Sequence, residues 1–213
     1  MKKILWGIFI FFAVVIGVYP LAYLFFDMSQ GFLAGKTDLK DQLWPFAFYV
    51  HISFGGLALF IGWLQFVNAF RNKYLKWHRM IGKVYLISIL FSGVAGLYIS
   101  FFATGGIIST LGFGGLAICW VATSVSAYLS ILKGQINDHE YWMIRSYALC
   151  FAAVTLRLWI PLSQIGFQMD FLFAYRIISW LCWIPNLIVA EFMIRSLKNS
   201  RIATESIRSI LKQ

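Results

Sequence analysis

The chain has 213 residues, of which 61% are hydrophobic and only 12% are charged, and its mean hydropathy is +0.77. A soluble domain is about half apolar and about a quarter charged, so this composition excludes a soluble globular protein and indicates a polytopic membrane protein. A net charge of +10 is also typical of proteins that bind nucleic acids, but the position of the charges along the chain suggests another origin.

Six apolar segments are long enough to cross a hydrocarbon core of about 30 Å as helices of roughly 20 residues. The loops between them are short, so the sequence predicts an all-α fold in which residues 1–194 form one bundle of six transmembrane helices. Residues 195–213 are basic and amphipathic, which is typical of a helix that lies on the inner leaflet. The predicted spans are residues 4–26, 45–69, 80–103, 109–132, 142–165 and 173–194.

The basic residues predict the orientation of the bundle. On a path that crosses the membrane six times, most of them fall on one side, which the positive-inside rule makes cytoplasmic. Both termini are therefore expected inside, and the basic charge serves topology and attraction to anionic lipid headgroups, with no nucleic-acid partner. The residues on this side are Lys2, Lys3, Arg71, Lys73, Lys76, Arg79, Lys83, Lys133, Arg145, Arg195, Lys198, Arg201, Arg208 and Lys212.

The first segment begins with two lysines before its apolar run, as a secretory signal does. It is too long for a signal and has no small-residue cleavage site, so it is expected to be a retained span with a kink at Pro20. The second span carries His51 on a face that also holds Gly55, Ala58 and Gly62. A histidine in a span is expected to face the bundle interior.

Small residues recur at helical spacing in the third and fourth spans, and such stripes predict close packing between helices. The third span has Ser92, Gly96 and Ser100 in this pattern. The fourth span has Gly115, Cys119, Ala122 and Ser126. All three cysteines, Cys119, Cys150 and Cys182, fall inside spans without a CxxC pair, so they are expected to be packing residues.

The fifth and sixth spans contain polar residues within apolar runs. Asn137 followed by Glu140 predicts a capping box at the start of the fifth span, which carries Arg157 further along. The sixth span has Arg176 near its outer end, and Pro185 in its middle predicts a bend. Glu191 is the one carboxylate within this span, which argues against an acidic proton relay across the membrane.

Three groups that can carry a positive charge are expected at one depth in the outer half of the membrane: His51, Arg157 and Arg176. Because a charge inside a span costs free energy, it indicates a functional site by default. Here it predicts a pocket for an anionic or carbonyl-bearing ligand, such as a lipid headgroup, a quinone or a haem propionate. The alternative is structural, with the arginines bound to helix carbonyls or to Asp27, Asp41 and Asp170.

Two further histidines, His78 and His139, are expected at the cytoplasmic starts of the third and fifth spans. Two histidines on facing helices are what a b-type haem or a small metal site requires. The arrangement is similar to that of transmembrane b-type cytochromes, although a protein of that class with two haems has two histidine pairs. Arg79, Lys83 and Arg145 are candidate contacts for haem propionates or other anionic groups.

Three stretches resemble a family of bacterial six-span membrane proteins catalogued as a domain of unknown function. They are WHRMIGKVYL, HEYWMIRSYALCFAAVTLRLWIPL and RIISWLCWIPNLIVAEF, within a region from His51 to Glu191. The resemblance implies six spans and a bacterial inner-membrane location, and it implies no catalytic residue.

The leading functional hypothesis is an inner-membrane protein that binds a lipid, a quinone, a similar ligand or a partner membrane subunit through the outer pocket. No catalytic motif identifies a reaction: HExxH, GxSxG and a phosphate-binding glycine loop are all absent from the sequence. The alternatives are a b-haem electron carrier that uses His78 and His139, and a transporter of small solutes. The transporter lacks support from an inverted repeat.

Overall fold

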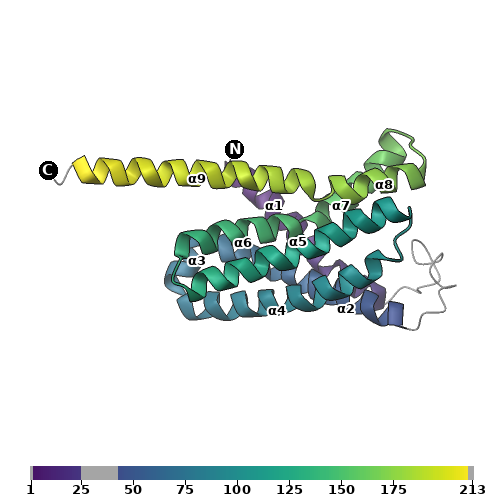
Figure 1. Cartoon of the computed structure of the whole chain (residues 1–213), viewed down its shortest axis with the longest axis horizontal. Coiled ribbons are helices and arrows are strands. Elements are labelled where there is room, and N and C mark those ends of the chain that lie inside the picture. Colours follow the sequence, from purple (N-terminus) through teal and green to yellow (C-terminus); the bar gives the residue numbers. More distant parts are fainter. Residues whose placement is uncertain (1, 25–42, 211–213) are drawn as a thin grey trace.

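A computed structural model of the protein describes residues 2–24 and 43–210 (Figure 1). Within these two ranges the chain is helical almost throughout and contains no strand. Six stretches of the described chain are long and apolar enough to cross a membrane, so the predicted all-α bundle of six spans is confirmed. They are Lys3–Tyr23, Leu43–Phe66, Leu75–Ser100, Ile107–Leu132, Ile136–Gly166 and Phe171–Ile207.

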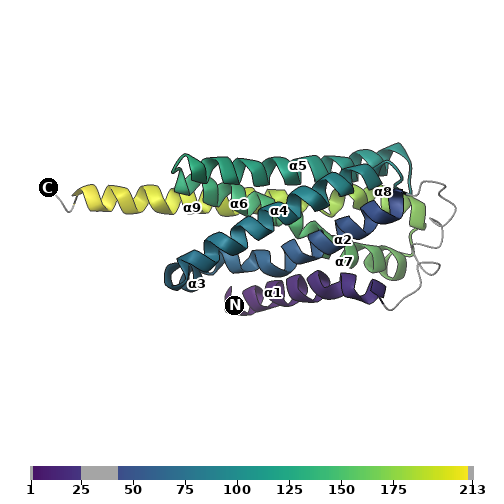
Figure 2. The same ribbon diagram turned by 90° about the horizontal axis from the view of Figure 1, so that it is seen from below.

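The first span lies along one edge of the bundle, where Figure 2 shows it beside α2 and α7. It consists of α1 (Lys2–Val18) and the 3-10 turn η1 (Tyr19–Leu24), so the α-helix ends just before Pro20, whose ring prevents regular helix geometry. Large side chains of α1, such as Ile4 and Phe11, are exposed, as expected for a surface that faces lipid.

The second, third and fourth spans pack around a stripe of small residues. The second span is α2 (Leu43–Gly62) with the 3-10 turn η3 (Trp63–Phe66), and α3 (Asn68–Lys73) connects it to α4 (Leu75–Ser100). The predicted stripe of α4 is confirmed, because Ser92, Gly96 and Ser100 face the interior, where Ser92 and Ser100 are buried. A Cβ atom on Gly96 would lie 2.8 Å from the His51 ring, so the two helices approach closely.

The stripe predicted for the fourth span, Gly115, Cys119, Ala122 and Ser126, packs only in part, because Cys119 contacts the core but the face as a whole is not the buried one. Helix α5 (Ile107–Leu132) buries Ser109, Gly112, Ala117 and Ser124, while Ala122 is exposed. The other face, with Cys119, Ala122 and Ser126, lines a surface groove between α5, α6 and α9. Small residues recur on both faces of this helix, so their spacing alone could not identify the packed face.

The fifth and sixth spans are both interrupted. The fifth consists of α6 (Ile136–Cys150), α7 (Ala152–Pro161) and a π-helical turn η4 (Leu162–Gly166), with a break at Phe151. The sixth consists of α8 (Phe171–Leu181) and α9 (Ile184–Ile210), with a break at Cys182 and Trp183. Pro185 is the second residue of α9, a position that tolerates proline, and the bend expected near it lies two to three residues earlier, at Cys182 and Trp183.

Thr155 and Asn186 connect the two breaks. The Asn186 side-chain amide donates to Ala148 O at 3.2 Å and to Cys182 O at 3.0 Å, and Thr155 also donates to Cys182 O. Interrupted membrane helices are tolerated where side chains satisfy the backbone groups that the break releases. The two polar side chains therefore allow two adjacent spans to be broken inside the bundle.

Helix α9 extends past the rest of the bundle toward the C-terminus (Figure 1), so the predicted tail after residue 194 continues the sixth span as one helix. Arg201 of this extension forms an ion pair with Glu140 near the start of α6. The capping box predicted at Asn137 is wrong, because α6 begins at Ile136 and its N-cap is Gln135, with no side-chain cap. Glu140 bonds to the α9 extension instead.

Candidate functional site

A cavity of about 250 Å³ lies inside the bundle, and its lining residues come from α1, η1, α2, α4, α5, α6, α7 and α8 and from the loop between α4 and α5. Its walls are mostly aliphatic and aromatic, and they extend from Trp120 in the middle of α5 to the loop at Phe102–Thr104 between α4 and α5. The two residues on either side of the α6–α7 break, Cys150 and Ala152, belong to this wall. For comparison, a cavity of about 150 Å³ in another protein admits benzene. A single substituted ring therefore fits.

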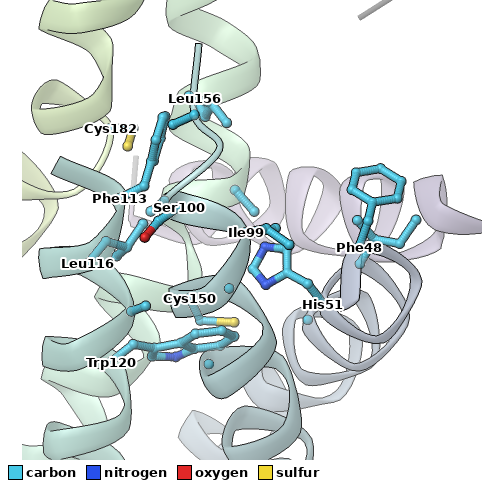
Figure 3. Close-up of a pocket in the computed structure, with 18 of the residues that line it drawn as sticks. Phe48, His51, Ile99, Ser100, Phe113, Leu116, Trp120, Cys150, Leu156 and Cys182 are labelled. Carbon is cyan, nitrogen blue, oxygen red and sulfur yellow. The ribbon is translucent and has the colours of Figure 1, made fainter. Parts of the chain in front are cut away.

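His51 presents its imidazole to this cavity from the middle of α2. Figure 3 shows the ring pointing away from its own helix, toward the helices that carry Trp120, Leu116 and Cys150. The ring is held by α4, because Nδ1 lies 2.9 Å from Ser92 O and the Ser92 hydroxyl donates to His51 O at 2.8 Å. The predicted inward orientation of His51 is confirmed.

Arg157 is the charged residue of the cavity wall. Its guanidinium donates to Ala153 O at 2.8 Å within its own helix and lies 4.9 Å from the centre of the Tyr19 ring. It lies near enough to His51 for the two groups to interact electrostatically. Among the described residues no carboxylate forms an ion pair with Arg157. Asp27 and Asp41, the proposed partners from the second loop, lie outside the described residues.

The structure does not bring Arg176 into the cavity. Its guanidinium donates to Gly105 O at 3.0 Å and so connects α8 to the loop between α4 and α5. Its neighbour Tyr175 lines the cavity instead. Asp170 does not reach either arginine, since its carboxylate caps α8 by accepting from Phe173 N at 2.9 Å. Of the three residues expected in one pocket, His51 and Arg157 are together and Arg176 is separate.

His78 and His139 lie near each other at the opposite end of the bundle. Each is the fourth residue of its helix, because α4 and α6 begin earlier than expected. His139 Nδ1 lies 2.8 Å from Ala127 O, while His78 Nδ1 is buried without a hydrogen-bond partner. Neither histidine lines the cavity or the surface groove, and no group of three metal-binding side chains occurs in the described chain.

The three basic residues proposed to accompany this histidine pair have different surroundings. Arg79 and Lys83 are exposed on α4. Arg145 forms a two-point ion pair with Glu191, at 2.5 and 3.0 Å, and lies 4.6 Å from the centre of the Trp142 ring. Glu191, which is the single carboxylate of its span in the sequence, therefore has a partner on the neighbouring span, and both residues line the surface groove.

Sequence reasoning missed most of the cavity wall. Trp120, Phe113 and Tyr175 contribute aromatic surface, and Gly96 allows the His51 ring to lie against α4. Aromatic residues are so frequent in this chain, at 19% of all residues, that their presence in a span does not identify a site. Pro161 signals an irregular fifth span, and broken helices line ligand sites in several classes of membrane protein, but no residue type in the sequence marks the break at Phe151.

The fold and the cavity define the class of the protein: a polytopic membrane protein with a helical bundle that encloses a largely apolar site. Residues 48–194 match the sequence profile of a family described as "Predicted membrane protein (DUF2306)". Because the match spans more than half of the chain, the protein belongs to this family, which confirms the resemblance seen in the sequence. No curated protein and no solved structure matches the chain.

Proposed function

We propose that the protein binds a single-ring ligand of the quinone class in the cavity of His51 and Arg157. One observation carries the proposal: an imidazole and a guanidinium are placed in a mostly apolar and aromatic wall inside the bundle. Ligand sites typically combine apolar walls with a few convergent polar groups. A ring with an oxygen at each of two edges places one polar atom near each of these groups while its faces contact aromatic side chains.

A phospholipid headgroup fits the same wall less well. The headgroup carries a phosphate and often a second charge, and burying charges inside a bundle is costly unless each of them is paired. Arg157 offers one cation, and its first donor is already bonded to Ala153 O. A neutral ring oxygen requires only a hydrogen bond, so the cavity suits a ring ligand better than a charged one.

The test is to purify the protein in a mild detergent, identify co-purifying quinones and lipids by mass spectrometry, and titrate a short-tailed benzoquinone. Arg157→Met removes the donor and is expected to weaken binding about tenfold or more, since a hydrogen bond to a charged group contributes about 1.5–3 kcal/mol. Arg176→Met is the matched control, because this arginine lies outside the cavity and makes one bond to Gly105 O.

Equal binding by the wild type and Arg157→Met would refute the proposal. So would co-purification of a phospholipid that depends on Arg157, in the absence of any quinone or ring ligand, because that result assigns the cavity to lipid. Loss of binding in both variants would mean that both arginines are needed for the fold, and the assignment of Arg157 to the ligand would then be withdrawn.

We propose as a second candidate that His78 and His139 bind a b-type haem. The Nδ1–H of His139 donates to Ala127 O, so the lone pair of Nε2 is available to a metal. This arrangement is usual for histidines that bind a metal. A haem needs two imidazoles, whereas a zinc ion needs more ligands than this pair supplies. Difference spectra of the reduced and oxidised protein test the idea. A haem band must vanish in His78→Ala and His139→Ala and persist in His51→Ala.

We also propose that the bundle end with His78 and His139 faces the cytoplasm of a bacterial cell, with both termini inside. The basic residues of the described chain concentrate at this end, which contains α3 and the starts of α4 and α6. Single cysteines in a cysteine-free background provide the test. Ile107→Cys, at the opposite end, is expected to react with a membrane-impermeant maleimide in intact cells, and Lys133→Cys only after lysis; the reverse pattern would invert the topology.

A further inference from the structure

The hydrogen bonds of His51 define which of its ring nitrogens carries the proton. Nδ1 lies 2.9 Å from Ser92 O, and a carbonyl oxygen can only accept, so Nδ1 is the donor. The Ser92 hydroxyl also lies 3.2 Å from Nδ1, but its own proton goes to His51 O at 2.8 Å. In the neutral imidazole the other nitrogen, Nε2, is therefore an acceptor.

The packing of α4 keeps the ring in this orientation. A Cβ atom on Gly96 would lie 2.8 Å from Nδ1 and 2.9 Å from Cε1, so the imidazole lies directly against the α4 backbone. Turning the ring over would place a carbon where Nδ1 now meets Ser92 O, and the buried carbonyl would lose its donor. Such a loss costs free energy in an apolar interior.

Within the cavity Nε2 is an acceptor, and no side chain of the described chain donates to it. Among the described residues the hydrogen bonds of the His51 ring are those to Ser92, and both involve Nδ1. Arg157 offers only donors, because a guanidinium has no acceptor. A second positive charge on His51 would lie beside Arg157 inside the membrane, which is costly. His51 thus presents an acceptor to the cavity and Arg157 presents donors, and the indole N–H of Trp120 in the same wall is a further donor, buried without a partner among the described residues.

We infer that the cavity selects the reduced, hydroquinone form of its ring ligand over the oxidised quinone. The inference rests on the function proposed above. A hydroquinone has a hydroxyl that donates to His51 Nε2 and a second ring oxygen that accepts from Arg157. A quinone has two carbonyl oxygens, both acceptors, so one of them would face the lone pair of Nε2 without a proton between them. An unsatisfied pair of this kind is expected to lower affinity about tenfold.

The experiment compares a short-tailed benzoquinone with its hydroquinone by isothermal titration calorimetry, under anaerobic conditions and with the titration of empty micelles subtracted. The wild type is expected to bind the hydroquinone about tenfold more tightly. The hydroquinone dimethyl ether, which has the same ring but no hydroxyl donor, is expected to bind no better than the quinone. This ligand-side control requires no change to the protein.

His51→Gln provides the protein-side test, because a side-chain amide offers either a donor or an acceptor. This variant is expected to bind both forms with affinities within about threefold of each other, whereas Arg157→Met should weaken both. If the wild type binds both forms equally, or the quinone more tightly, the inference is overturned while the proposed function stands. If neither form binds, the proposed function itself fails.

Discussion

His51 and Ser92 exchange two hydrogen bonds that run in opposite directions between α2 and α4. The ring Nδ1–H donates to Ser92 O, and the Ser92 hydroxyl donates to His51 O. One bond orients the imidazole and the other connects the two helices at the same level. The side chain proposed to contact the ligand is therefore held in place by the contact between α2 and α4.

Ser92→Ala is expected to lower the stability of the bundle by about 1 kcal/mol, the usual net contribution of one buried hydrogen bond. Nδ1 keeps its acceptor, because Ser92 O belongs to the backbone, so ligand binding should change by less than about threefold. Unfolding by SDS titration measures the stability. Ser130→Ala is the control, since that hydroxyl bonds only to Ser126 O within its own helix. An equal loss in both variants would contradict the role of Ser92 between helices.

Gly96→Ala is expected to displace the His51 ring, because the added Cβ would meet Nδ1 at 2.8 Å. Overpacking of this kind costs about 1–3 kcal/mol, and the displaced imidazole should also weaken ligand binding. Gly115→Ala is the matched control, since its Cβ would make an ordinary contact of 3.7 Å with Trp183. Thermal unfolding in detergent and ligand titration of both variants measure the two effects. Similar behaviour of the two variants would exclude steric control at Gly96.

The sequence contained enough information for the spans and for His51, because both depend on short-range patterns: apolar length and one polar residue on a face of small ones. The sequence patterns did not predict at which level in the bundle α7 and α8 contact the other helices. Arg157 and Arg176 looked equivalent in the sequence, yet only Arg157 lines the cavity. Their difference arises from the breaks at Phe151 and Cys182. These breaks are supported by contacts between residues that are distant in sequence, from Asn186 to Ala148 and from Thr155 to Cys182.

Asn186→Leu is expected to destabilise the protein by about 1–3 kcal/mol, because Ala148 O and Cys182 O lose a donor inside the bundle. Asn186→Asp should be at least as damaging, since a carboxylate of the same shape accepts where a donor is needed. The control is Asn137→Leu, an exposed position near the start of α6 that makes no cap. SDS titration of the three variants provides the comparison, and a loss at Asn137 equal to that at Asn186 would restore the capping-box interpretation.

A chain of buried hydroxyls connects α4, α5 and α6 outside the cavity wall. The Ser124 hydroxyl donates to Trp120 O at 2.7 Å, so the 2.7 Å bond between Ser124 and Ser146 must be donated by Ser146. The proton of the 2.9 Å bond between Tyr85 and Ser146 then comes from Tyr85. Each hydroxyl thus has one acceptor, and the chain ends on a backbone carbonyl.

This direction predicts unequal effects along the chain. Ser146→Ala leaves the buried Tyr85 hydroxyl without this acceptor, so it should lower the free energy of unfolding by about 1–3 kcal/mol. Tyr85→Phe removes one hydrogen bond and leaves no buried donor unpaired, so it should lower the free energy of unfolding by about 1 kcal/mol. The double variant removes both partners, so its loss should be smaller than the sum of the two single losses. Unfolding free energies from SDS titration of the four proteins measure the coupling. Strict additivity would show that Tyr85 and Ser146 do not depend on each other and that the hydroxyl chain does not act as a unit.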